Sequence, residues 1–64
     1  MNILALKGKI VERGMTQQQL AKELGITPKT LYTKMKKGVF GTDEVEKMIK
    51  ILKIENPMEI FFDL

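Results

Sequence analysis

The sequence contains no cysteine and no histidine. Their absence excludes disulfide bonds, thiolate nucleophiles and imidazole bases, together with the usual zinc and haem ligands. A small domain without disulfides is typical of a reducing compartment, and the opening residues MNILALKGKI lack the apolar stretch and cleavage site of a signal peptide. We therefore expect a cytoplasmic protein that uses no metal and no other cofactor.

The chain is also too short for a second domain. The 64 residues suffice for one small domain and not for two, so a single domain over residues 1–64 is expected. Hydrophobic residues make up 44% and charged residues 30% of the chain, which is the composition of a globular protein rather than a disordered or membrane-spanning one. We expect no membrane partner and, without room for a ligand-sensing domain, no small-molecule ligand.

Basic residues are concentrated in the first two thirds of the chain. Residues 1–41 carry eight lysine or arginine residues against two glutamates, a net charge of +6, whereas residues 42–64 carry three lysines against six acids, a net charge of −3. A basic half indicates a nucleic-acid-binding protein, because neutralisation of phosphates supplies most non-specific affinity. The alternative is a soluble surface that is merely rich in lysine, and charge alone does not separate the two.

Start and stop signals divide the chain into five predicted helices and no strand. Asn2 is expected to cap the first helix, and Gly14 to end it in a left-handed conformation. Lys7 falls near the middle of the apolar stripe of this helix. The sequence does not predict its position, except that the aliphatic part of its side chain is long enough to carry the ammonium group to the edge of the stripe. That stripe is expected to consist of Ile3, Leu6 and Ile10, widened by Leu4 and Val11.

The second and third helices follow closely. Thr16 and Gln19 form a capping box for the second helix, which Gly25 ends. Thr27-Pro28 then supplies an N-cap and an N1 proline for the third helix. The residues expected to face the core here are Leu20, Ala21, Leu24, Leu31 and Met35, with Phe40 from the following loop as a plug.

Gly38 is expected to close the third helix, and Thr42 to cap the fourth. Asn56-Pro57 repeats the cap and N1 proline before a short last helix. The only carboxylate cluster is interpreted as charge at the start of the fourth helix rather than as catalytic machinery, so the protein is not expected to be an enzyme. That cluster consists of Asp43, Glu44 and Glu46, and the apolar face of the same helix of Val45, Met48, Ile49 and Leu52.

Residues 17–36 have the layout of a helix-turn-helix, whose second helix can enter the DNA major groove. Ala21 is small where the two helices would cross, Gly25 permits the tight turn, and Leu31 fills the core behind the exposed helix. Any helical hairpin needs some of these features. Their spacing, together with capping signals on both sides of the turn, favours DNA binding.

The segment TQQQLAKELGITPKTLYTKMKKG, residues 16–38, resembles the helix-turn-helix of phage Cro and repressor proteins, the xenobiotic-response-element family. The resemblance implies a compact, all-α, five-helix domain with the lambda-repressor-like fold. The stretches GKIVERGMTQQQLA and IFF are similar to short phage or prophage members from Gram-positive bacteria. An Arg and Glu pair that is frequent in the family is replaced here by Ile10 and Met35, which puts in doubt how rigidly the third helix is held.

The resemblance also implies site residues. Lys29 and Thr33 match positions that reach base edges, and Pro28 matches another but has no side-chain donor and can only pack. Some of the expected phosphate contacts have alternative interpretations. Gln17 could be a solvated first-turn residue and Tyr32 a surface aromatic. Lys36 and Lys37 could instead interact favourably with the helix dipole. The expected phosphate contacts are Gln17, Thr27, Thr30, Tyr32, Lys34, Lys36 and Lys37.

The expected function is that of a sequence-specific transcriptional regulator that binds a double-stranded DNA operator through the major groove. One such module buries only about 600 to 1,000 Å² on DNA, so a homodimer is expected, at least on DNA. The alternative is a protein-interaction or antitoxin-like module that uses the same fold. The candidates for the dimer contact are Met58, Phe61, Phe62 and Leu64.

Overall fold

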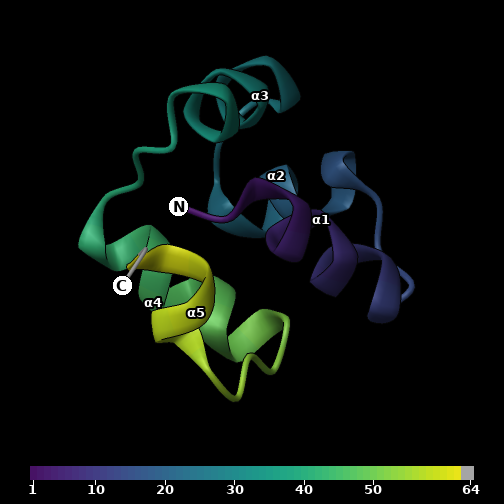
Figure 1. Ribbon diagram of the computed structural model, residues 1–64. Helices are drawn as coiled ribbons and strands as arrows, with labels where there is room; N and C mark the ends of the chain where they lie inside the picture. The colour runs from purple at the N-terminus through teal and green to yellow at the C-terminus, as the bar shows by residue number, and fades with distance from the viewer. Residues whose placement is uncertain (63–64) are drawn as a thin grey trace.

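The computed structural model describes residues 1–62, which fold into five helices without a strand among them. Figure 1 shows α3 at one end of the molecule, α4 and α5 at the other, and α1 and α2 between them. The predicted all-α, five-helix architecture is confirmed. In the described part of the chain, every helix is too short or too polar to cross a membrane. The helices are α1 (Ile3–Glu12), α2 (Gln17–Leu24), α3 (Pro28–Lys37), α4 (Thr42–Ile51) and α5 (Pro57–Phe61).

Local capping defines the first three helices as predicted. The Asn2 side chain accepts a hydrogen bond from the Ala5 N–H at 3.0 Å at the start of α1. Thr16 and Gln19 form the reciprocal capping box of α2, and the Thr27 hydroxyl accepts from the Thr30 N–H at the start of α3. Because each cap satisfies backbone donors that the helix itself leaves unpaired, these starts need no distant partner.

One predicted cap is wrong. Thr42 is the first residue of α4 rather than its cap; the N-cap position is Gly41, whose N–H donates to Glu44 Oε1 at 2.8 Å. At α5, Asn56 is the N-cap residue and Pro57 the first helical residue, as predicted. The Asn56 side chain makes no capping hydrogen bond there, and its Nδ2 instead donates to Glu59 Oε2 at 3.4 Å.

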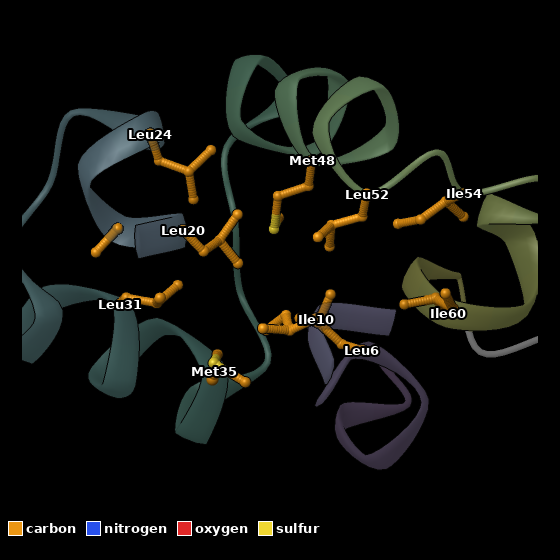
Figure 2. Packing of buried hydrophobic residues seen from close by; sticks show 11 residues of the cluster. Leu6, Ile10, Leu20, Leu24, Leu31, Met35, Met48, Leu52, Ile54 and Ile60 are labelled. Carbon is orange, nitrogen blue, oxygen red and sulfur yellow. The ribbon is translucent and has the colours of Figure 1, made fainter. Parts of the chain in front are cut away.

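One core unites all five helices, and Figure 2 shows its side chains converging from different elements. Ile10 and Met35 are 2% and 3% exposed and belong to this core. They stand where the family that residues 16–38 resemble frequently has an Arg and Glu pair. Phe40 is half-buried and packs against it, in agreement with its expected role as a plug. The buried residues are Leu6, Ile10, Leu20, Ala21, Leu24, Leu31, Met35, Met48, Leu52, Ile54 and Ile60.

The apolar stripe of α1 is narrower than predicted. Leu6 and Ile10 are buried and Ile3 is half-buried, whereas Leu4 and Val11 are 81% and 73% exposed. Successive residues of a helix differ by about 100° around its axis, so Leu4 and Val11 fall together on the side away from the core. The expectation that they widen the inner face was wrong.

Candidate nucleic-acid interface

The turn between α2 and α3 is held by backbone hydrogen bonds. Gly25 ends α2 with a φ of +73°, and the N–H of Ile26 donates to the Ala21 carbonyl at 3.0 Å. Ala21 is fully buried, and its small side chain lets α3 pack closely against α2. Leu31 and Met35 are buried on the inner side of α3, so the opposite side of this helix is presented to solvent.

The exposed side of α3 brings two predicted base contacts together. Lys29 and Thr33 are exposed one helical turn apart and line the same shallow hollow of about 450 Å³. The Thr33 hydroxyl donates to the Lys29 carbonyl at 3.0 Å, so its oxygen can still accept a hydrogen bond. Pro28 is exposed at the first position of α3, outside that hollow.

The predicted phosphate contacts lie on two flanks of α3. Thr30, Lys34 and Lys37 line the same hollow as Lys29, whose wall is completed by the exposed Val39. A second hollow of about 170 Å³ lies between α1, the start of α2 and the other flank of α3. Its lining consists of Ile3, Lys7, Gln17, Tyr32, Met35 and Lys36.

Thr27 has a structural role beside its predicted phosphate contact. Its hydroxyl oxygen accepts from the Thr30 N–H, and the hydroxyl donates to Thr30 Oγ1 at 2.9 Å. The pair therefore defines the first turn of α3. Their phosphate contacts stay a prediction.

Lys34 differs from the other lysines of α3 because it is bound to α4. Its Nζ lies 2.8 Å from both carboxylate oxygens of Glu44, and both side chains are partly buried. Burial raises the pKa of Glu44, but the hydrogen bonds from Lys34 and the Gly41 N–H and the charges of Lys34 and Lys47 outweigh it, so the pKa is lowered from its ordinary value. This ion pair connects α3 to the start of α4.

Other basic side chains are also engaged in the fold. Arg13 Nε donates to the Leu52 carbonyl at 2.9 Å, and Lys9 pairs with Glu12 at 3.2 Å. Within the described residues, Lys7, Lys29 and Lys36 take part in no ion pair, and all three are exposed. Of the exposed lysines that take part in no ion pair of the described residues, Lys29, Lys36 and Lys37 lie on α3. The others lie on α1, α2 and α4 and directly after α4: Lys7, Lys22, Lys47, Lys50 and Lys53.

Three residues of this region have surroundings that the sequence does not predict. Glu44 was interpreted only as a first-turn acid, and nothing in its local sequence signals the bond to Lys34 ten positions earlier. The sequence predicts no position for Lys7, which lines the same hollow as Gln17 and Lys36. For Val39, the sequence offers a single signal, its position directly after the helix-ending Gly38.

The predicted dimer contacts lie in and beside α5. Met58 and Phe62 are 48% and 51% exposed, and Phe61 is half-buried against the core. Leu64 lies outside the described residues. Within the described part of the chain, acidic residues nowhere form a cluster suited to a metal ion.

Residues 2–63 match a protein family whose description is "Protein of unknown function (DUF739)". No curated protein and no solved structure matches the chain significantly.

Proposed function

The chain belongs to DUF739, a protein family of unknown function, and on that premise we propose a function from the surface around α3. The protein is a sequence-specific transcriptional regulator that binds double-stranded DNA, with α3 inserted in the major groove of an operator. Occupation of that operator blocks or recruits RNA polymerase. The resemblance of residues 16–38 to phage Cro and repressor proteins supports this proposal.

The observation that carries the proposal is the composition of the exposed side of α3. This helix carries four lysines and no acid, and Lys29 and Thr33 lie together on the side away from the core. A lysine can donate to guanine O6 or N7, and a threonine can donate, accept or touch a thymine methyl group. An α-helix of this kind fits the major groove of B-form DNA.

The surroundings of α3 supply contacts to the DNA backbone. The capping box of α2 uses the N–H groups of Thr16 and Gln19, which leaves the N–H groups of Gln17 and Gln18 without a partner inside the helix. These groups, together with the positive end of the helix dipole, suit a phosphate. Lys36 and Lys37 at the end of α3 add positive charge on the two flanks of this helix.

A second copy of the chain completes the surface. One small module buries too little DNA surface for high specificity, so two copies on a two-fold operator are required. Met58 in α5 and Phe62 directly after it expose apolar area that the core does not use. We assign the dimer contact to this part of the chain, with Phe61 at its edge.

The experiment that tests the proposed function is selection of bound sequences from random double-stranded DNA, followed by affinity measurements at several salt concentrations. We expect one enriched motif with two-fold symmetry and a steep loss of affinity with salt, because several phosphate contacts release counterions. Binding without sequence preference, or a flat salt response, contradicts the proposal and favours a protein-interaction or antitoxin-like module instead.

A further inference from the structure

Lys7 interrupts the inner face of α1 and is not needed there for packing. It lies in the sequence between the core residues Leu6 and Ile10, yet its side chain is exposed. Instead of joining the core, it lines the hollow that Gln17 and Lys36 also line. Helix α1 therefore contributes a cation to the flank of α3, although it is separate from the helix-turn-helix in sequence.

The residue types around this hollow suit an anion, although most of its lining surface is apolar. Lys7 and Lys36 are basic residues from two helices, Gln17 and Tyr32 are polar, and no carboxylate is among the lining residues. Two like charges that share a hollow repel each other, and an anion between them converts that repulsion into attraction. Ile3 and Met35 supply the apolar part of the lining.

The size of the hollow distinguishes between kinds of anion. Its volume of about 170 Å³ is small. Pockets for drug-sized ligands hold roughly 300 to 1,000 Å³. A single phosphate group fits this space, whereas a nucleotide or cofactor does not. The hollow also adjoins α3, whose outer side carries the proposed base contacts.

We propose that Lys7 is a backbone-phosphate contact, and that a phosphodiester group of the bound DNA lies in the hollow between Lys7 and Lys36. The inference rests on the proposed function and extends its DNA surface from α2 and α3 to α1. It also gives a reason for a lysine in an otherwise apolar stripe.

The test compares Lys7→Ala with Lys9→Ala on the same helix. Lys9 is the matched control because it pairs with Glu12 and lines a different hollow, between α1 and α5, which also contains Glu55 and Glu59. Affinity is measured by fluorescence anisotropy on the selected duplex and on a random duplex at several salt concentrations. Circular dichroism verifies that each variant is folded.

We expect Lys7→Ala to reduce the slope of log affinity against log salt by about 0.9, the value for one lost phosphate contact. Affinity for both duplexes should fall by a common factor, Lys7→Arg should retain the slope, and Lys9→Ala should leave it unchanged. An unchanged slope in Lys7→Ala, while Lys36→Ala lowers it, overturns the inference and leaves the proposed function standing. Absence of a salt slope in the unmodified protein contradicts the proposed function itself.

A second arm identifies the source of the phosphate. Inorganic phosphate is titrated against the protein–DNA complex, with sodium chloride at matched ionic strength as the comparison. Equal competition by the two salts supports a phosphate that belongs to DNA. Phosphate that still binds to the protein in the presence of saturating DNA, and no longer binds to Lys7→Ala, overturns the assignment and indicates a site for the free ion.

Discussion

Four lysines on α3 share one side-chain chemistry but have different surroundings. Lys29 lies beside Thr33 on the side away from the core, Lys34 is bound to Glu44, and Lys36 borders the hollow next to α1. Their roles therefore follow from their neighbours rather than from their charge. Substitutions at single positions should separate these roles.

Lys29→Ala should relax sequence preference at one base pair, with a loss of about 1 to 3 kcal/mol on the selected operator and little loss on random DNA. Lys36→Ala should weaken binding to all DNA alike and lower the salt slope by about one. Anisotropy on selected and random duplexes distinguishes the two outcomes. Equal losses on both duplexes for both variants contradict these assignments.

Glu44→Gln should lower the free energy of unfolding by about 1 kcal/mol at neutral pH, because it removes the partly exposed ion pair with Lys34. The lowered pKa of Glu44 means that this stabilisation is fully present above its ordinary value of 4.5. It is lost as the pH falls through the lower pKa of the folded state. The difference between the unmodified protein and Glu44→Gln should therefore shrink in acid.

Urea unfolding across that pH range measures this difference. Glu46→Gln is the matched control, because Glu46 is exposed on the same helix and takes part in no ion pair of the described residues. A difference for Glu44→Gln that is the same in acid and at neutral pH would show that the charge of Glu44 has no stabilising role.

At the scale of helices, the ends are defined by a few residues with special backbone requirements. Gly25 and Gly38 end α2 and α3 with φ values of +73° and +71°, in the left-handed region that residues with a Cβ disfavour. Gly8 is different, because it lies in the interior of α1. The same substitution should therefore have opposite effects at different glycines.

Gly25→Ala should lower the free energy of unfolding by about 1 to 2 kcal/mol, the cost of the left-handed conformation. A Cβ at Gly25 meets no atom within 4 Å, so the cost is conformational and not a clash. Gly8→Ala should raise stability by roughly 0.5 to 1 kcal/mol, because a Cβ there is also unobstructed and alanine favours a helix. Thermal or urea unfolding checks the signs, and changes of the same sign contradict the argument.

At the scale of the whole molecule, one core supports two surfaces with separate proposed roles. The exposed side of α3 is basic, whereas the surface beside α5 exposes Met58 and Phe62. Asn2 N–H donates to the Ile60 carbonyl at 2.8 Å, which fastens α5 to the start of α1. A dimer contact at α5 is therefore attached to the same rigid core as the proposed DNA surface.

Phe62→Ser should leave the fold intact and weaken dimer formation on a two-fold operator by about tenfold or more, because burial of a phenylalanine contributes roughly 1.5 to 3 kcal/mol. Leu4→Ser is the control, since Leu4 is even more exposed but lies on α1, away from the core side. Sedimentation measures the number of copies per duplex. A monomer both free and on the operator shows that the dimer prediction is wrong.

Much of the fold was predictable because its determinants are local. Thr16, Gln19 and Thr27 form caps with backbone groups only a few residues away, and Gly25 relieves a constraint within its own residue. Such signals act wherever the helix lies in space. The prediction of Thr42 as a cap was wrong because a carboxylate held by a distant lysine occupies that helix start.

The sequence by itself determined the number of helices, most of their ends and most of the buried core, because capping and apolar periodicity act over a few residues. Ile54 is a core residue that was not predicted. Only the tertiary structure decided which charged side chains form hydrogen bonds or ion pairs within the fold and which stay exposed. Lys34 and Arg13 are engaged by groups from distant segments, whereas Lys7 and Lys36 line the same hollow from two helices. These arrangements depend on how the helices pack, and packing brings together residues that no local pattern connects.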